Sequence, residues 1–189
     1  MKKILIATKN KDKFEIVTKI LDKINDETYQ FYSLYDIPDL VKDEKEVGNI
    51  KERAFAKANQ IYTSIKEKDF AYIIGIDDGI KMKGSLKPNV KDYMKDIIED
   101  KYLTEGESVE IVRAYCCINQ EGKSNIVITE IPFTYSKYEG SLKIEANSYP
   151  LSNVLKPLNV DKTVAQMSKE ENNQYYLQYS EKQLKEILI

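Results

Sequence analysis

The chain lacks histidine altogether and contains few cysteines, few glycines and no long apolar run. Without histidine, its 189 residues cannot build a Ser-His-Asp or Cys-His catalytic group or a histidine zinc site. Any catalysis would have to use carboxylates, lysines, hydroxyl groups or a hard metal ion. Because Asp and Glu far outnumber soft ligands, the composition favours magnesium (Mg2+) over zinc as a metal.

The scarcity of thiols and of apolar sequence also bears on location. Cys116 and Cys117 are adjacent, and neighbouring cysteines rarely pair with each other, so two thiols indicate a reducing compartment. The apolar part of the N-terminus is too short for a signal peptide, and no segment approaches the length of a membrane span. The formal net charge of -2 gives no reason to expect a nucleic-acid polymer as a partner. We therefore expect a cytoplasmic protein that binds neither membranes nor nucleic-acid polymers.

The hydrophobic pattern predicts an α/β protein in which residues 1–189 form a single domain. Asn49 is a plausible N-cap for a helix, with Glu52 completing a capping box. An apolar strand at 71–76 is expected to stop at the turn signal Asp77-Asp78-Gly79. The other expected elements are strands at 3–7, 29–34, 109–118 and 125–133, helices at 11–24, 90–99 and 183–188, and a hairpin turn at 119–122.

The first candidate site is the loop between the first strand and the first helix. It reads Thr8-Lys9-Asn10-Lys11-Asp12-Lys13, and it is not a Walker loop because it contains no glycine. A helix N-terminus attracts phosphate, and a hydroxyl, an amide and lysines suit several phosphate oxygens. The ordinary alternative is a solvated turn in a lysine-rich protein.

Two further candidate sites contain carboxylates. Glu46 precedes the helix that carries Lys57, where an acid often only complements the helix dipole. Asp77 and Asp78 follow an apolar strand, and ligands of open α/β sheets gather at the carboxyl ends of strands. Two carboxylates there could hold a divalent ion and orient a water molecule. An Asp-Gly turn without a functional role is the alternative.

In this order, the three places resemble the inosine triphosphate pyrophosphatase family. That family opens with [S/T]-x-N-x-x-K, which Thr8, Asn10 and Lys13 match. Its E-T-G and E-N-A-x-x-K-A segments correspond here to EVGNIKERAFAKA, which contains Glu46 and Lys57. Its D-D-S-G-L motif corresponds to IDDGI, and the later segments RAYCCI and KTVAQMSKEEN also resemble the family. The resemblance extends over nearly the whole chain.

The resemblance implies a mixed, elongated sheet flanked by helices, with two lobes and a cleft between them, and a homodimer. It implies hydrolysis of a nucleoside triphosphate between the α and β phosphates, on substrates such as the triphosphates of inosine and xanthosine. Thr8, Asn10, Lys13 and Lys57 would then hold the phosphates. Glu46 and Asp77 would bind magnesium, and either Asp77 or Asp78 would orient the attacking water.

The sequence departs from the family at several positions. Ile76 takes the place of the first acid of the third motif, and Arg53 takes the place of the asparagine of E-N-A. The segments expected to enclose and read the base correspond to 148–153 and to Tyr176, Leu177 and Gln178, and both are poorly matched. We therefore expect altered base specificity. The alternatives are a weak or inactive nucleotide-binding relative with a structural or regulatory role, and an enzyme for another phosphorylated metabolite.

Overall fold

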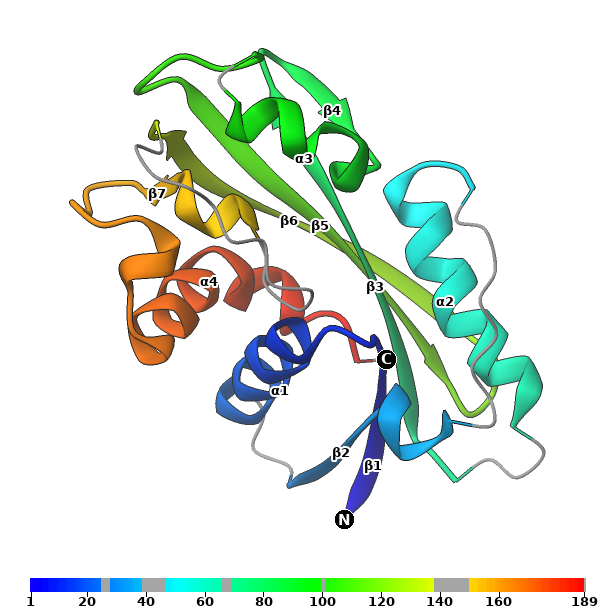
Figure 1. Cartoon of the computed structure of the whole chain (residues 1–189). Helices are drawn as coiled ribbons and strands as arrows, with labels where there is room; N and C mark the ends of the chain where they lie inside the picture. The colour runs from blue at the N-terminus through cyan, green and yellow to red at the C-terminus, as the bar shows by residue number, and fades with distance from the viewer. Residues whose placement is uncertain (25–27, 39–46, 66–68, 100, 138–149, 189) are drawn as a thin grey trace. The chain divides into compact units, whose positions relative to one another are not determined.

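A computed structural model of the chain describes residues 1–24, 28–38, 47–65, 69–99, 101–137 and 150–188 (Figure 1). Its α-helices are α1 (Lys11–Ile24), α2 (Ile50–Ser64), α3 (Val90–Ile98) and α4 (Lys169–Leu184). Its strands are β1 (Lys2–Ala7), β2 (Tyr29–Ser33), β3 (Tyr72–Met82), β4 (Ser85–Lys87), β5 (Ser108–Asn119), β6 (Ser124–Tyr135) and β7 (Leu155–Pro157). Short 3-10 helices are η1 (Leu34–Asp36), η3 (Pro150–Asn153) and η4 (Val164–Gln166). None of the described helices is both long enough and apolar enough to cross a membrane.

The described strands form one mixed sheet. Their order is β2-β1-β3-β5-β6-β7, and β4 pairs with β3. β1 is parallel to both of its neighbours, with Ile6 opposite Ser33 of β2 and Ala7 opposite Gly75 of β3. The pairs β3–β4 and β6–β7 are antiparallel. This arrangement of strands and helices confirms the predicted mixed α/β fold.

Two compact units divide the chain. Unit 1 consists of Met1–Asp77, Arg113–Thr129 and Tyr179–Ile189, and unit 2 consists of Asp78–Val112 and Glu130–Gln178. Unit 1 contains β1, β2, α1 and α2, and unit 2 contains β4, α3 and β7. Each unit is therefore assembled from segments that are distant in the sequence.

The helices of unit 1 form where the sequence indicates them. The apolar positions of α1 point into the core and include Ile16, Val17, Ile20 and Leu21. In α2, the side chain of Asn49 accepts hydrogen bonds from the first turn, while the Glu52 carboxylate accepts one from the Asn49 N–H at 2.8 Å. The predicted capping box is thus confirmed, and it fixes where α2 begins.

Two predicted element bounds are wrong. β3 does not stop at Asp77 but continues to Met82, and the chain turns at Lys83 and Gly84, whose φ angles are 49° and 74°. Positive φ at both positions suits a two-residue hairpin loop. The last helix was expected at 183–188, whereas α4 covers Lys169–Leu184. The sequence of α4 is polar and shows no clear apolar stripe, so hydrophobic periodicity does not indicate a helix there. Tertiary contacts stabilise this helix instead.

The part of β5 that belongs to unit 1 is buried on both faces. Cys116 and Cys117 are consecutive, so their side chains point to opposite faces of the sheet, yet both are fully buried. Both thiols are free. Burial raises the pKa of Cys116 to about 11, and burial together with the neighbouring thiol raises the pKa of Cys117 to about 12. Neither cysteine is therefore a reactive thiolate at neutral pH.

Candidate functional site

The β1–α1 loop, residues 8–10, is held by its own side chains. The Asn10 N–H donates a hydrogen bond to Thr8 Oγ1 at 3.1 Å, and the Lys13 N–H donates one to Asn10 Oδ1 at 2.9 Å. Asn10 therefore caps α1, and Thr8 shapes the turn that precedes it. The first N–H groups of a helix have no partner within the helix, so the start of α1 offers donors to an anion.

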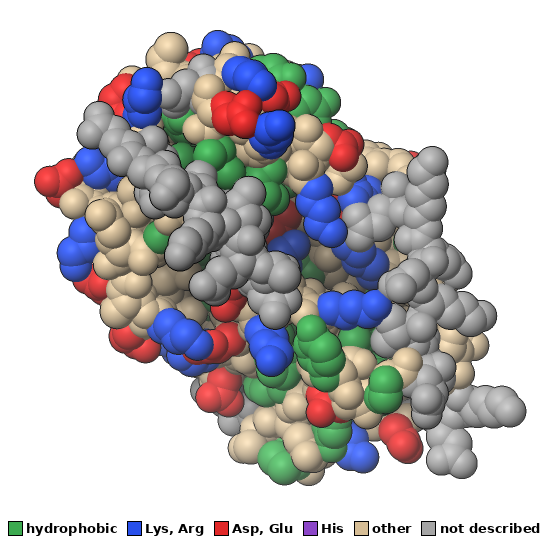
Figure 2. Space-filling model, viewed as in Figure 1, with side chains coloured by type: hydrophobic (Ala, Val, Ile, Leu, Met, Phe, Trp, Pro, Cys, Tyr) green, Lys and Arg blue, Asp and Glu red, His purple; other side chains and the backbone are tan. Residues whose placement is uncertain are grey.

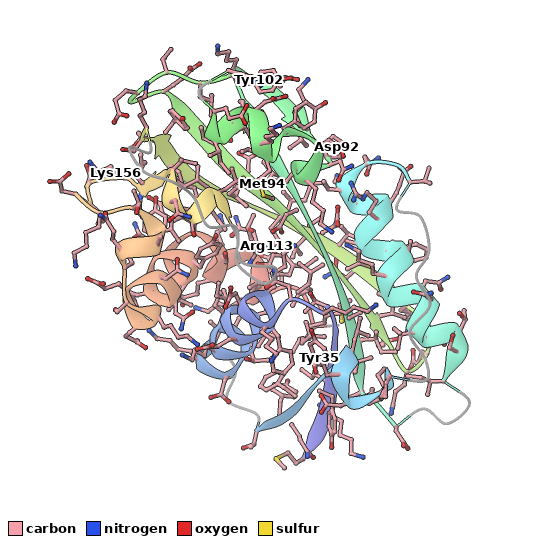
Figure 3. The ribbon with its side chains drawn as sticks, in the orientation of Figure 1. Tyr35, Asp92, Met94, Tyr102, Arg113 and Lys156 are labelled. Carbon is pink, nitrogen blue, oxygen red and sulfur yellow. The ribbon has the colours of Figure 1, made fainter. Side chains whose placement is uncertain are left out.

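Tyr35 of η1, which directly follows β2, contacts the β1–α1 loop (Figure 3). Its hydroxyl donates a hydrogen bond to the Lys9 carbonyl oxygen at 2.9 Å, and Lys11 Nζ lies 5.7 Å from the centre of its ring. The ring is 59% exposed. An exposed aromatic ring is therefore fixed directly beside the β1–α1 loop.

The carboxyl ends of β1 and β2 meet here, level with the middle of β3. Because Ala7 lies opposite Gly75, the β1–α1 loop leaves the sheet at the end where β3 presents Asp77. Because Ile6 lies opposite Ser33, η1 also begins at this end. In sheets of this kind, ligands bind beyond the carboxyl ends of the strands. Asp77 therefore lies on β3 near the level at which β1 ends and the segment with Thr8, Asn10 and Lys13 begins.

Helix α2 lies against β3 because Gly75 has no side chain. A Cβ atom on Gly75 would lie 2.0 Å from the carbonyl oxygen of Ala54 and 2.7 Å from the backbone nitrogen of Ala58. Ala54 and Ala58 are fully buried. Since Arg53 and Lys57 precede these alanines by one residue each, the same close contact brings both cations to Asp77, two residues after Gly75 on the same face of β3.

Arg53, Lys57 and Asp77 form a cluster that we call the charge triad. Lys57 Nζ lies 2.5 Å from Asp77 Oδ1, and Arg53 Nε lies 3.2 Å from Asp77 Oδ2. The Arg53 contact is an ion pair by distance, but its N–H is not aligned as a hydrogen bond. The side chains of Arg53 and Asp77 are 6% and 5% exposed, whereas that of Lys57 is 27% exposed. Lys57 is therefore the member of the triad that solvent reaches best. Figure 2 shows Lys and Arg side chains gathered on the viewed face beside α2.

Asp77 and Asp78 do not form a two-carboxylate site. Both lie within β3, and successive side chains of a strand point to opposite faces of the sheet. Both are buried. We expected both carboxylates to lie together in a turn after the strand. Instead, β3 includes both residues and continues to Met82, so their side chains lie on opposite faces of the sheet.

The described residues contain no group of three or more acidic, histidine or cysteine side chains that could hold a metal ion. Each oxygen of Asp77 faces a cation of the charge triad. Glu46, the second predicted ligand, lies outside the described residues.

Arg53 departs from the family motif in sequence, and in the structure it is a member of the charge triad. The available signal was its spacing. Arg53 lies four residues before Lys57, the predicted phosphate ligand. In a helix this spacing puts both side chains on the same face. A second buried arginine, Arg113, lies in β5 (Figure 3) and was not predicted either.

The positions expected to read the base lie mainly in the core of unit 2. Tyr176 and Leu177 of α4 are each 6% exposed, and the ring of Tyr176 packs against Phe133 with 6.3 Å between the ring centres. Gln178 is exposed. Of the segment 148–153, the structure describes the part that forms η3. Tyr176 is thus a packing residue and offers no open face on which a base could stack.

Together these features define an α/β protein with a cation-rich cluster on β3, near the level at which the parallel strand β1 ends. Its fold is similar to that of a HAM1 protein from Coxiella burnetii, with a TM-score of 0.70 and 16% sequence identity over 98% of this chain and 97% of that chain. It is also similar to the Staphylococcus aureus Ham1 protein, with a TM-score of 0.61 and 18% identity over 92% of this chain and 90% of that chain.

A third similar structure is a nucleoside-triphosphatase, or dITP/XTP pyrophosphatase, from Mycobacterium abscessus. The TM-score is 0.60 and the identity 16%, over 94% of both chains. The chain therefore has the Ham1 and dITP/XTP pyrophosphatase fold, which confirms at the level of the fold the resemblance indicated by its motifs. No protein-family model matches the chain, and no curated protein matches it in sequence.

Proposed function

We propose that this chain is a divergent nucleoside triphosphate pyrophosphohydrolase. The reaction is attack of water on the α-phosphorus and cleavage of the bond between the α and β phosphates, giving a nucleoside monophosphate and pyrophosphate. The observation that carries the proposal is the charge triad, whose Asp77 lies on β3 two residues beyond the position paired with the last residue of β1, the strand that leads into the capped start of α1. The motifs and the shared fold support the same reaction.

Each group of the site has a role in this proposal. Thr8, Asn10 and Lys13, together with the free donors at the start of α1, bind the phosphate tail. Lys57 adds positive charge that stabilises the leaving pyrophosphate. Asp77 orients the attacking water, because an ionised carboxylate can accept a hydrogen bond from it. Asp78, on the other side of the strand, is the alternative for that role.

The proposed substrates are triphosphates of deaminated purines, with weaker discrimination between bases than the family resemblance implies. The burial of Tyr176 and Leu177 removes two of the positions at which the base would be read. Magnesium, bound by Glu46 and Asp77, stays a prediction, as do the homodimer and the cytoplasmic location.

The second candidate function is nucleotide binding without turnover. The observation in its favour is that both oxygens of Asp77 already face cations of the charge triad. In this arrangement the charge of Asp77 serves to compensate Arg53 and Lys57. In such a relative, the phosphate ligands would persist while catalysis is weak or lost.

A panel of nucleoside triphosphates with magnesium distinguishes the two functions. Release of pyrophosphate supports hydrolysis between the α and β phosphates, whereas release of phosphate alone points to another reaction. Binding of a triphosphate without either product supports the second function. Lys57→Gln should lower kcat/KM for pyrophosphate release by about 10- to 100-fold, because it removes one charge-assisted contact to phosphate. Lys51→Gln is the matched control, because Lys51 is an exposed lysine of the same helix.

A further inference from the structure

The peptide group that joins Lys9 to Asn10 has both of its hydrogen-bonding groups engaged. The Asn10 N–H donates to Thr8 Oγ1 at 3.1 Å, and the Lys9 carbonyl oxygen accepts a hydrogen bond from the Tyr35 hydroxyl at 2.9 Å. The first contact lies within the β1–α1 loop, whereas Tyr35 belongs to η1, 26 residues further along the chain. The orientation of this peptide group therefore depends on a side chain from outside the loop.

The two N–H groups that follow are available as donors. In the part of the chain that the structure describes, the N–H groups of Lys11 and Asp12 donate to no other residue, whereas the Lys13 N–H donates to Asn10 Oδ1 at 2.9 Å. The carbonyl oxygen directly before them, that of Asn10, accepts a hydrogen bond from the Phe14 N–H at 3.0 Å. The first turn of α1 therefore offers donors, which suit an anion.

We propose that Tyr35 is a positioning residue for phosphate binding. By holding the Lys9 carbonyl oxygen, it keeps an acceptor that would repel phosphate turned away from these donors, and its ring holds the Lys11 side chain at the first residue of α1. The proposal rests on the proposed function, because it concerns how the same site binds a polyphosphate chain. Tyr35 lies outside every motif that supports the family resemblance.

The contact between Lys11 and the Tyr35 ring supports this role. Lys11 is exposed and begins α1, where the helix dipole disfavours a cation. The acid four residues later, Glu15, lies 3.0 Å from Lys19, and no described acid forms an ion pair with Lys11. Lys11 Nζ instead lies 5.7 Å from the centre of the Tyr35 ring. A cation placed against the dipole in this way is stabilised when an anion binds beside it.

The backbone around Tyr35 is itself fixed. The Tyr35 N–H donates to Ser33 Oγ at 3.2 Å, and the Asp36 carboxylate accepts hydrogen bonds from the Ser33 N–H at 2.7 Å and from the Ser33 hydroxyl at 2.9 Å. This capping box orders η1. The Tyr35 ring is nevertheless 59% exposed, so burial in the core does not account for its position.

The test is isothermal titration of the full chain with inorganic tripolyphosphate in magnesium, a probe that has no base. Tyr35→Phe removes only the hydroxyl, and we expect it to bind about fivefold more weakly than the wild type, because a hydrogen bond that orders the loop is lost. Tyr62→Phe is the matched control, because the Tyr62 hydroxyl of α2 forms no hydrogen bond with a described residue. The control should bind as the wild type does.

A second set of variants tests the ring. Tyr35→Leu removes the ring as well as the hydroxyl, and we expect it to bind about threefold more weakly than Tyr35→Phe. In the Lys11→Gln background, Tyr35→Phe and Tyr35→Leu should bind equally, because the ring acts through the ammonium. A difference that persists in that background would overturn the part assigned to the ring.

The amide NMR signals of Lys11 and Asp12 give a direct readout of the proposed donors. Both signals should shift in the wild type at saturating tripolyphosphate, because these N–H groups donate to phosphate. A purely structural role for Tyr35 would instead lower the Tm of Tyr35→Phe and leave its affinity for tripolyphosphate unchanged.

Equal affinity of Tyr35→Phe and wild type would overturn the proposal, as would an equal loss of affinity in Tyr62→Phe. Unmoved signals of Lys11 and Asp12 at saturating tripolyphosphate, or no binding of this probe by the wild type, would overturn it too. Release of pyrophosphate from nucleoside triphosphates alongside any of these results refutes this inference alone. The expected losses of affinity without hydrolysis of any nucleotide refute the proposed function alone.

Discussion

Gly75 of β3 and Ala54 of α2 approach so closely that a Cβ atom on the glycine would lie 2.0 Å from the alanine carbonyl oxygen. Gly75→Ala should therefore push α2 away from β3 and lower the free energy of unfolding by about 1–3 kcal/mol or more. Urea denaturation measures this change. Gly84→Asn is the control, because Gly84 has φ of 74° with no atom near its missing Cβ, and asparagine tolerates this conformation. Equal stability of Gly75→Ala and wild type would contradict the close contact between α2 and β3.

Asn10 has two functions that substitution can separate. Its carboxamide oxygen caps α1, and its amide group belongs to the proposed phosphate site. Asn10→Asp should keep the cap and the stability but weaken binding of tripolyphosphate, because it adds negative charge. Asn10→Ala should lose the cap and about 1 kcal/mol of stability. Thermal denaturation and titration calorimetry of the two variants measure these effects, and unchanged phosphate binding by Asn10→Asp would remove Asn10 from the site.

Base discrimination should be weak. A site that hydrogen-bonds a keto group rejects analogues strongly, because its own polar groups would be left unpaired. Tyr176 and Leu177 are packed in the core and cannot impose that penalty. We expect kcat/KM for inosine triphosphate to exceed that for ATP and GTP by less than a thousandfold. A larger ratio, measured by pyrophosphate release, would mean that other residues read the base.

Stability should decrease at alkaline pH because of the two buried thiols. Their pKa values rise from an ordinary value of 9.0 to about 11 for Cys116 and about 12 for Cys117. Between pH 9 and these values the unfolded chain loses protons that the folded chain retains, so rising pH favours unfolding. Each thiol contributes at most about 1.4 kcal/mol per pH unit to the slope. Denaturation at pH 8 and pH 10 measures the loss, and the double variant Cys116→Ala, Cys117→Ala should lose less; an equal loss would contradict this origin.

The sequence predicted those parts of unit 1 that depend on local signals. The helix 11–24 shows apolar residues at helical spacing, and the start of α2 carries its own capping box at Asn49 and Glu52. The strand-loop-helix order placed Thr8, Asn10 and Lys13 at a helix start, where the structure also has them. These features need no information about distant residues.

The missed features depend on tertiary contacts. Two consecutive aspartates in an apolar strand indicate a turn unless something compensates their charge, and for Asp77 that compensation comes from α2. The length of α4 was missed because the sequence KEENNQYYLQYSEKQL has no clear apolar stripe, while Tyr175 and Tyr176 pack against Phe133. β4 and β7 are three residues each, which is too short for a periodic signal.

The two free thiols buried in β5 allow the rate at which the folded chain opens locally to be measured. A thiol reagent cannot reach Cys116 or Cys117 until the sheet around them separates. In the folded state the labelling rate therefore reports how often this part of unit 1 opens. A bound polyphosphate that stabilises the same unit should slow labelling in proportion to its occupancy, so binding can be followed without a chromophore, a metal or turnover.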